Sequence, residues 1–463
     1  MDLQGKNVLV AGMGKSGVAA ARLLHREGAR VTVSDSRSRK ALGRKSFELE
    51  RLAIAVEAGK HAAETFNRAD LIVLSPGIPL TLAPVAGAIR RGVPVIGEME
   101  LAFAFLKAPV LAITGSNGKS TTTTLLGDIL EGWGKQVFTG GNLGTPLSEF
   151  VLSGESADWI VLEVSSFQLE TIRTFRPFVG ILLNITPDHL DRYRDLREYA
   201  EAKLRLFENQ TPADFAVLNA EDPWTEAAAG HSRGTPVLFS RKGPVPGGTY
   251  VDEGWITSEI GGVRRRICEA AKMGIPGGHN LDNALAAASA ALLCGCPPEL
   301  AGETLQKFAG LEHRLEFVRE LQGVRYFNDS KGTNVGAVVR SLETFEGPVI
   351  LIAGGRDKGG DFAPLRERIS GRVKQVVLIG EAREKMAEAL AGTTEIVEAR
   401  TLIEAVSRAY LTSRNGDVVL LSPACASFDM FKNFEDRGER FKDLVWKLPE
   451  IALERLDGRH PTG

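Results

Sequence analysis

The chain has 463 residues, of which 43% are hydrophobic, and this length is sufficient for about three domains that each bury a core. The formal net charge is −2, so the overall charge gives no indication of nucleic acid or an anionic membrane as a partner. No apolar stretch reaches the roughly 18 residues of a membrane span, the first residues lack the apolar run of a signal peptide, and the four cysteines contain no CxxC pair. We therefore expect a cytoplasmic protein with free thiols and with neither nucleic acid nor membrane as a partner.

The first 97 residues predict a parallel α/β sheet with a nucleotide-type turn. A strand over 7–11 leads into a GxGxxG turn over 12–17, a helix over 18–27 and a strand over 30–34 that ends at Asp35. Two more strands are predicted, over 69–74 and 93–96. The turn and the helix N-terminus suit any diphosphate, whether of a dinucleotide or of a UDP-sugar. The alternative is that these glycines serve only close packing of the helix.

A second glycine loop follows the apolar run 110–113 and reads TGSNGKSTTT over residues 114–123. A strand that runs into two glycines, a lysine and a hydroxyl-rich helix start is typical of a triphosphate site. Lys119 would neutralise phosphate oxygens, and the Ser120 hydroxyl could ligate Mg²⁺. Because Gly115 lies only three residues before Gly118, the loop is a variant of the usual P-loop. The alternative, a polar turn that holds these residues by chance, leaves the combination unexplained.

Polar side chains follow the next two predicted strands of the central segment. The strand over 159–162 ends at Glu163, and the strand over 179–183 ends at Asn184, with Asp188 and His189 shortly after it. Ligand groups of open α/β sheets gather at the carboxyl ends of the strands, so these residues are expected near the phosphate loop. The alanine-rich stretch 283–293 predicts a helix, and His279 with Asn280 before it is more typical of a capping turn than of a ligand pair.

The segment 195–207 predicts a helix with a lysine on its apolar face. The apolar stripe includes Tyr199, Ala200 and Leu204, and Lys203 falls on the same stripe. An unpaired ammonium group is costly to bury, and desolvation lowers the pKa of an amine until it can react with carbon dioxide to form an anionic carbamate. The alternative is a lysine whose stem packs in the core while its head reaches water.

The third segment begins near Gly310 and repeats the α/β rhythm. Strands are predicted over 349–353, 376–379 and 418–421, and glycine-rich or polar loops follow the first and the last of them. His313 fits core packing. The last dozen residues carry no pattern and predict a loose tail. The predicted fold class is therefore α/β with three domains: a Rossmann-like domain over 1–97, a central P-loop ATPase-type parallel sheet over 98–309, and a Rossmann-like domain over 310–463.

Five motifs between residues 115 and 434 together resemble the Mur ligase family of ATP-dependent amide-forming enzymes, and the resemblance covers essentially the whole chain. The motifs are Gly115-Ser-Asn-Gly-Lys-Ser-Thr-Thr-Thr, Glu163-Val-Ser-Ser-Phe-Gln-Leu-Glu, Asn184-Ile-Thr-Pro-Asp-His-Leu-Asp-Arg-Tyr, Asn328-Asp-Ser-Lys-Gly-Thr-Asn and Ser422-Pro-Ala-Cys-Ala-Ser-Phe-Asp-Met-Phe-Lys-Asn-Phe. The resemblance implies a monomeric enzyme of peptidoglycan precursor synthesis that uses ATP and Mg²⁺. Within the family it implies that D-glutamate is added to UDP-N-acetylmuramoyl-L-alanine through an acyl phosphate.

The resemblance also implies a role for each matching residue. The implied catalytic residues are Lys119, Glu163, His189 and Lys203, with Lys203 carbamylated. The implied Mg²⁺ ligands are Glu163, His189 and Lys203, beside Ser120. The implied ATP contacts are Gly115, Asn117, Gly118, Lys119, Ser120, Thr121, Asn283, Arg314 and Asp329. The UDP-substrate would meet Gly14, Ser16, Asp35, Arg37 and Asn142, and D-glutamate would meet Lys331, Thr333, Lys358, Ser427 and Phe434.

One loop departs from the family pattern, and other functions compete with this interpretation. The loop 354–360 is richer in glycine than the family's, which leaves open which basic residue of 356–358 meets the amino acid. A nicotinamide dehydrogenase would explain the GxGxxG turn and Asp35 but not the loop with Lys119. A P-loop binding module without chemistry is a further alternative. Folylpolyglutamate-type ligases are disfavoured because a UDP-type segment precedes the P-loop here.

Overall fold

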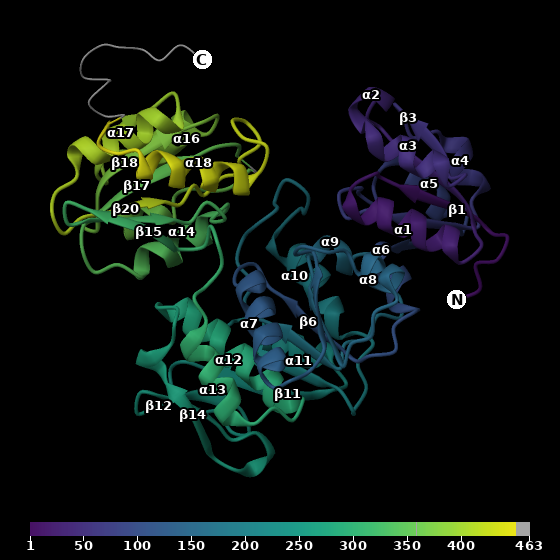
Figure 1. The fold of residues 1–463 in the computed structure, drawn as a ribbon, viewed down its shortest axis with the longest axis horizontal. Helices are drawn as coiled ribbons and strands as arrows, with labels where there is room; N and C mark the ends of the chain where they lie inside the picture. The colour runs from purple at the N-terminus through teal and green to yellow at the C-terminus, as the bar shows by residue number, and fades with distance from the viewer. Residues whose placement is uncertain (358, 451–463) are drawn as a thin grey trace. The chain divides into compact units, whose positions relative to one another are not determined.

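The structure is a computed structural model that describes residues 1–357 and 359–450 (Figure 1). Its contacts group the chain into two compact units. Unit 1 comprises Met1–Ile185, Ala200–Lys272 and Asp282–Gln306, and unit 2 comprises Thr186–Tyr199, Met273–Leu281 and the chain from Lys307 onward. Two predictions lie outside the described residues: a glutamate contact at Lys358 and a loose tail over the last dozen residues.

A five-stranded parallel sheet, coloured purple in Figure 1, opens the chain in the order β3-β2-β1-β4-β5. Its strands are β1 Asn7–Ala11, β2 Arg30–Asp35, β3 Ala55–Ala58, β4 Leu71–Leu74 and β5 Val95–Gly97. Its helices are α1 Lys15–Arg26, α2 Arg39–Leu42, α3 Arg44–Arg51, α4 Ala63–Arg68, α5 Ala83–Arg90 and α6 Glu98–Phe103. The helix predicted over 18–27 begins three residues earlier, because Gly14 is already its N-cap. Gly17 therefore lies in the first turn, where a Cβ atom would come within 1.9 Å of the Gly12 carbonyl oxygen.

A nine-stranded sheet follows in the order β14-β13-β12-β11-β10-β9-β6-β8-β7. Its strands are β6 Val110–Thr114, β7 Val137–Gly141, β8 Trp159–Glu163, β9 Val179–Leu182, β10 Phe215–Asn219, β11 Thr235–Ser240, β12 Thr249–Asp252, β13 Trp255–Ser258 and β14 Arg265–Glu269. Its helices are α7 Lys119–Gly132, α8 Leu147–Ser153, α9 Ser166–Leu169, α10 Leu196–Leu204, α11 Thr225–His231, α12 Gly278–Leu293 and α13 Pro298–Lys307. The pairing is parallel from β7 to β12 and antiparallel at β13 and β14. Strand β14 is thus an outer edge, and it begins with two exposed arginines, Arg265 and Arg266.

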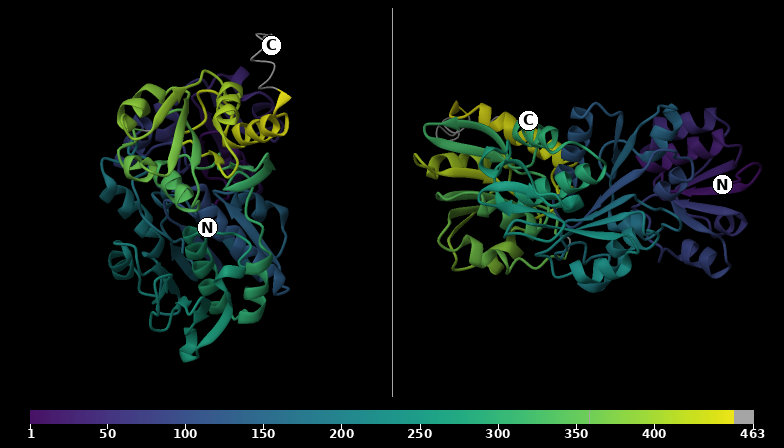
Figure 2. Two further views of the ribbon diagram at one scale, coloured as in Figure 1. Left: turned by 90° about the vertical axis from the view of Figure 1, so that its left-hand side faces the viewer. Right: turned by 90° about the horizontal axis from the view of Figure 1, so that it is seen from below.

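A six-stranded sheet in unit 2 has the order β15-β16-β20-β17-β18-β19. Its strands are β15 Glu316–Leu321, β16 Val324–Asn328, β17 Val349–Gly354, β18 Val373–Ile379, β19 Glu395–Glu398 and β20 Val418–Leu421. Its helices are α14 Val335–Glu343, α15 Leu365–Ile369, α16 Arg383–Leu390, α17 Leu402–Thr412 and α18 Phe434–Trp446. Alternate residues of β17 enter two different cores, Leu351 one and Ile350 the other, so both faces of the sheet are buried. Figure 2 shows helices on both faces of this sheet.

Two buried glutamates of α6 join the first sheet of unit 1 to the second. The Glu100 carboxylate accepts hydrogen bonds from the backbone N–H groups of Arg173, Thr174 and Phe175 and from the Thr174 hydroxyl, at 2.6 to 3.0 Å. The Glu98 carboxylate accepts one from the Ser148 N–H of α8 at 2.6 Å, and burial raises the pKa of the Glu98 carboxyl. These contacts replace the water that the carboxylates lose on burial.

Two general expectations from composition can be compared with the described part of the chain. Within residues 1–357 and 359–450, no helix combines the length and the apolar character that crossing a membrane requires. The four cysteines all lie in this part, and none of them forms a disulfide.

Candidate active site

The phosphate loop lies between β6 and α7, as the sequence predicts. Gly118 is the N-cap of α7 in a left-handed backbone conformation, so the first N–H groups of the helix point out of the loop. The Lys119 ammonium group donates to the carbonyl oxygens of Gly115 at 2.8 Å and Ser116 at 3.0 Å. Lys119 is therefore folded over its own loop, where a phosphate group would compete with these two carbonyls for it.

Glu163, at the carboxyl end of β8, is contacted by the side chains of Ser120 and Asn142. The Ser120 hydroxyl donates to Glu163 Oε2 at 2.5 Å, and the Asn142 amide donates to Glu163 Oε1 at 2.6 Å. Ser120 and Glu163 are buried. The structure thus brings together three predicted residues that lie far apart in the sequence, and the hydroxyl and carboxylate oxygens are of the type that Mg²⁺ prefers.

Asn283 of α12 lies beside the helix that follows the phosphate loop. Its side-chain oxygen accepts a hydrogen bond from the Thr122 hydroxyl at 3.2 Å, and the residue is buried. Thr121, in the first turn of the same helix, is buried as well. The predicted ATP contacts of unit 1 therefore form one group around the N-terminus of α7.

The helix predicted over 195–207 is observed as α10, Leu196–Leu204, followed by a 3₁₀ turn over Arg205–Phe207. Lys203 is 1% exposed, and its neighbours on the stripe, Tyr199 and Leu204, are buried to the same extent. The prediction that Lys203 points inward is confirmed, because the 3.6-residue period places it among apolar residues. A head group that reaches water is inconsistent with this burial.

In the first sheet, the turn after β1 and the end of β2 lie side by side. Gly14 is exposed and Ser16 is half-buried at the start of α1, and the Arg37 side chain is 51% exposed. The Asp35 carboxylate is itself engaged, since it accepts hydrogen bonds from the Met13 N–H at 2.7 Å and from Arg37 on both oxygens. Burial favours a higher pKa for the Asp35 carboxyl, but the hydrogen bonds from Arg37 and Met13 outweigh it and lower the pKa to about 2. Both oxygens of Asp35 thus already have partners within the protein.

His189 lies in unit 2, in the loop that follows Ile185. Its backbone has a φ of +56°, which is uncommon for a residue other than glycine, and its N–H donates to Asp188 Oδ1 at 3.0 Å. The Asn334 amide donates to Asp188 Oδ2 at 3.0 Å. The loop is thereby attached to the N-terminus of α14, whose N-cap is Asn334.

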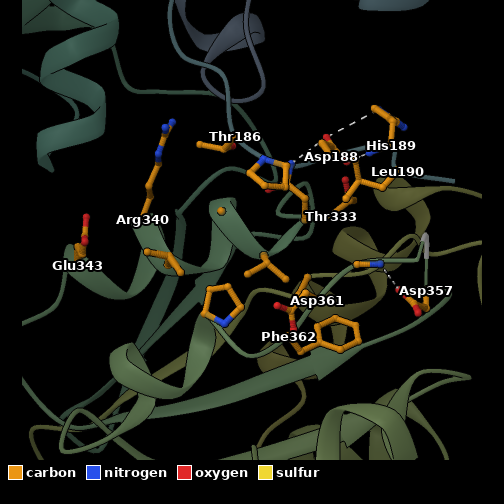
Figure 3. Close-up of a pocket in the computed structure, with 18 residues that line it drawn as sticks. Thr186, Asp188, His189, Leu190, Thr333, Arg340, Glu343, Asp357, Asp361 and Phe362 are labelled. Atoms are coloured by element: carbon orange, nitrogen blue, oxygen red, sulfur yellow. Dashed lines mark hydrogen bonds and ion pairs between the residues drawn. The ribbon is translucent and has the colours of Figure 1, made fainter. Parts of the chain in front are cut away.

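A cavity of about 480 Å³ in unit 2 is lined by this loop and by Thr333, one of the predicted glutamate contacts (Figure 3). Figure 3 shows His189, Asp188 and Thr333 on one side of the cavity and Asp361 and Phe362 on another. The structure therefore brings His189 and Thr333, predicted as a metal ligand and a glutamate contact, to one cavity.

The other predicted glutamate contacts gather where β16 and β20 end. These two strands are parallel neighbours, with Asn328 opposite Leu421, so the loops after them meet at one edge of the sheet. The Lys331 ammonium group lies 4.8 Å from the ring centroid of Phe434, and the buried Ser427 follows β20. Arg356, the basic residue of the glycine-rich loop that the structure describes, pairs with Glu381 through two contacts of 3.1 Å.

Asp329, predicted to contact ATP, is buried at the start of the same loop. Its Oδ2 accepts hydrogen bonds from the hydroxyls of Ser422 at 2.6 Å and Ser341 at 2.7 Å. Burial raises the pKa of the Asp329 carboxyl, although these hydroxyls and the nearby Arg314 act in the opposite direction. Asp329 therefore ties the loop after β16 to the loop after β20 and to α14.

The sequence analysis missed Arg437, whose guanidinium group holds together the loop after β16 and the loop after β20. This fully buried arginine of α18 donates to the Ser330 carbonyl at 2.7 Å, to the Ser330 hydroxyl at 3.0 Å and to the Cys425 carbonyl at 3.3 Å. Burial lowers the pKa of the guanidinium to about 10. The signal in the sequence was its helical spacing from the apolar Phe434 and Phe441, the same signal that identified Lys203.

Two histidines that the sequence analysis left outside the catalytic set, His279 and His313, lie in ordinary structural positions. His313 is buried, and its Nδ1 lies 2.9 Å from the Asn328 amide nitrogen, in agreement with core packing. His279 and Asn280, predicted in a capping turn before the helix, lie in the first turn of α12, which begins at Gly278, and the Asn280 side-chain amide donates to the Pro276 carbonyl at 2.7 Å.

Comparison with known proteins assigns the chain to a class. Its residues 6–97 match the Mur ligase MurD-like N-terminal domain, residues 113–291 the Mur ligase middle domain, and residues 313–425 the glutamate ligase domain of Mur ligases. The chain belongs to the Mur ligase family, whose members are ATP-dependent, ADP-forming ligases.

Individual relatives narrow the comparison further. A UDP-N-acetylmuramoylalanine–D-glutamate ligase of Geotalea uraniireducens is 50% identical over 452 residues, which cover 98% of this chain and 100% of the relative. A protein of the same name from Pelotomaculum thermopropionicum is 45% identical over 449 residues, 96% of this chain and 99% of that protein.

Solved structures share the fold at lower sequence identity. A pseudomurein peptide ligase type C from Methanothermus fervidus superimposes with a TM-score of 0.60 at 21% identity, covering 96% of this chain and 100% of that one. The MurF ligase of Thermotoga maritima, solved in complex with ADP, gives a TM-score of 0.59 at 19% identity, with 96% of each chain covered. The predicted α/β fold of the Mur ligases is thereby confirmed.

Proposed function

We propose that the protein is an ATP-dependent ligase that joins D-glutamate to UDP-N-acetylmuramoyl-L-alanine in peptidoglycan precursor synthesis. The observation that carries the proposal is the 45 to 50% identity, over nearly the full chain, to ligases named for this reaction. The geometry is compatible with it, since unit 1 has a phosphate loop and unit 2 has a basic side chain, Lys331, in the loop after β16. We propose the domain boundaries 1–97, 98–309 and 310–463, and a monomer located in the cytoplasm, on the same basis.

The first sheet would hold the UDP portion of the substrate. The exposed Gly14 and the half-buried Ser16 lie at the positive end of α1, and the half-exposed Arg37 lies beside them. Because the Asp35 carboxylate is occupied by Arg37 and Met13, we propose that Arg37 contacts the nucleotide and that Asp35 holds Arg37 in place.

The residues around the phosphate loop fit a magnesium ion. The buried hydroxyl of Ser120 and the carboxylate of Glu163 are hard oxygen donors in contact, and these two would hold the ion with carbamylated Lys203 of the same unit. His189, which lies in unit 2, stays a predicted ligand. When bound, Mg²⁺ supplies positive charge to the phosphate oxygens of ATP. Asn142 keeps the Glu163 carboxylate oriented through its hydrogen bond to Oε1.

The chemistry requires anionic groups to approach one another. The alanyl carboxylate of the substrate attacks the γ-phosphorus of ATP, ADP leaves, and an acyl phosphate forms. Two unit charges about 4 Å apart repel by about 4 kcal/mol at an effective dielectric constant near 20, so Lys119 has to shield the reacting phosphate. The amine of D-glutamate then attacks the acyl carbon, phosphate leaves, and the amine loses its proton as the amide forms.

The third segment would bind D-glutamate. Lys331, placed over the Phe434 ring, offers an ammonium group to a carboxylate, and Thr333 and Ser427 add hydroxyls from the neighbouring loops. Lys358 remains a predicted contact outside the described residues. Since Arg356 is already paired with Glu381, Lys358 is the better candidate for the second carboxylate.

The proposal is tested by measuring phosphate release from ATP with UDP-N-acetylmuramoyl-L-alanine and a panel of D- and L-amino acids. Release that depends on both the UDP-substrate and D-glutamate is expected. Release that depends on a different amino acid would contradict the proposed substrate, and release without the UDP-substrate would contradict ligation itself.

A further inference from the structure

Asn184, two residues after the end of β9, forms two hydrogen bonds with the backbone of the phosphate loop. The Asn117 N–H donates to Asn184 Oδ1 at 3.0 Å, and Asn184 Nδ2 donates to the Asn117 carbonyl at 3.0 Å. The Ser116 N–H also donates to the Asn184 backbone carbonyl at 2.8 Å. A single side chain thus pairs both polar groups of one loop residue, in the way that a neighbouring strand would.

The strand end that carries Asn184 is itself fixed by two other side chains of unit 1. The Asn219 amide donates to the Leu183 carbonyl at 3.0 Å, and the Ile185 N–H donates to Asp222 Oδ2 at 2.9 Å. Asn184 is 8% exposed. Because its neighbours Leu183 and Ile185 are both held by side chains, Asn184 has a fixed position at the end of β9. Its hydrogen bonds then fix the Asn117 backbone relative to this strand.

The loop approaches this strand end so closely that its first glycine is needed there. Gly115 has a φ of +152°, and a Cβ atom on it would lie 3.1 Å from the Leu183 Cβ and 3.3 Å from the Asn184 backbone nitrogen. In this variant loop the two glycines lie three residues apart, and Asn117 lies between them.

We propose that Asn184 is a positioning residue of the nucleotide site: it holds the Asn117 peptide in the orientation that presents the loop N–H groups to a triphosphate. The inference rests on the proposed ATP site and adds a residue that acts through the loop. Without the amide, the Asn117 N–H and carbonyl would lose the two hydrogen bonds that the Asn184 side chain provides. Ordering the loop would then reduce the free energy available for nucleotide binding.

The test compares Asn184→Ala and Asn184→Asp with the wild-type enzyme. Aspartate retains an acceptor for the Asn117 N–H, but it removes the donor and adds a negative charge beside the phosphates. The dissociation constant of a non-hydrolysable ATP analogue with Mg²⁺ is measured by calorimetry, and the KM values for ATP and D-glutamate and the kcat are measured by phosphate release.

The matched control is Asn209→Ala. This asparagine of the same unit donates to two backbone carbonyls, those of Arg173 and Phe175, both at 3.1 Å, and none of its contacts involves the phosphate loop. A comparable fall in Tm is expected for Asn209→Ala and Asn184→Ala, because each removes one side chain that bridges backbone groups.

In both Asn184 variants, the analogue dissociation constant and the KM for ATP are expected to rise by about tenfold or more, while the KM for D-glutamate stays within about twofold. Asn209→Ala should leave all three constants within about twofold of wild type. Unchanged analogue binding in the Asn184 variants, or an equal rise of both KM values, would overturn the inference. If Asn184→Ala does not fold, Asn184→Ser, which shortens the side chain without adding charge, replaces it in the same measurements. A wild-type protein that binds no triphosphate would instead contradict the proposed function.

Discussion

Arg37 holds the Asp35 carboxylate through two hydrogen bonds, from Nε to Oδ1 at 2.9 Å and from Nη2 to Oδ2 at 2.7 Å. The contact places a fixed ion pair at the end of β2, next to the turn that carries Gly14. It also makes the stability of the protein depend on pH in a defined range.

The Asp35 carboxyl should stabilise the fold above about pH 4 and lose this effect as the pH falls toward 2. The reason is that its pKa is about 2 in the folded protein against an ordinary value of 3.8, so the unfolded chain binds the proton first. Asp35→Asn should therefore weaken the pH dependence of the free energy of unfolding in this range, measured by urea denaturation. Arg37→Gln should move the loss of stability toward pH 4, and an unchanged profile in both variants would contradict the ion pair.

Lys119→Ala should lower the kcat for phosphate release by about a hundredfold or more, because one charged donor to the transferred phosphate is lost. The affinity for the UDP-substrate, measured by calorimetry, should stay nearly the same, since the first sheet does not include this lysine. Lys135→Ala is a suitable control, because this lysine lies over the Trp133 ring and outside the loop. An equal loss of UDP-substrate affinity in Lys119→Ala would contradict the assignment of the two sites.

Lys203→Ala should be inactive, and short-chain carboxylic acids should restore part of the activity by supplying the missing anion. In the wild type, a carbamate on this buried amine should give a carbonyl signal in ¹³C NMR after labelling with ¹³C-bicarbonate. The signal should be absent from Lys203→Ala. Full activity of the alanine variant would contradict the carbamate.

Lys331→Ala should raise the KM for D-glutamate by about tenfold or more and change the KM for ATP much less, because a charged contact to the amino acid is lost. Phe434→Leu, which removes only the ring beneath the ammonium group, should have a smaller effect. The measurement is phosphate release with each substrate varied in turn. Equal changes of the two KM values would indicate a role at the phosphates instead.

Glu100→Ala should lower the free energy of unfolding by about 3 kcal/mol. The reason is that four donors, the N–H groups of Arg173, Thr174 and Phe175 and the Thr174 hydroxyl, share this carboxylate as their acceptor. Glu100→Gln, which keeps one oxygen, should cost less. Glu149→Ala removes an exposed pair with Arg22 and should change the value by less than about 1 kcal/mol. The free energies of unfolding of the three variants are measured by urea denaturation. Equal effects of Glu100→Ala and Glu149→Ala would contradict the role of Glu100 in connecting the first two sheets.

The sequence predicted those features that depend on local pattern. Apolar runs identified β1 and β20 to the residue, and helical periodicity predicted the burial of Lys203. The antiparallel strands β13 and β14 were missed because each is short and carries little alternation. The start of α1 was predicted three residues too late. The whole GxGxxG motif was assigned to the turn, whereas its last three residues, from Lys15 to Gly17, belong to the helix.

The contacts that organise the candidate site could not be predicted in the same way. The amide of Asn184 meets the backbone of Asn117 across 67 residues of sequence, and no local pattern encodes such a pair. Arg437 was overlooked because a charged residue in a helix is normally exposed. The roles implied by family resemblance, including those of Arg314 and Phe434, remain predictions that the variants above can examine.

The outermost strand of the nine-stranded sheet has a consequence for behaviour at high concentration. Strand β14 leaves one row of backbone groups open to a further strand, yet it begins with Arg265 and Arg266, both exposed. A further strand that paired with this edge would have to desolvate these guanidinium groups, and charged side chains on an edge strand disfavour aggregation by strand addition.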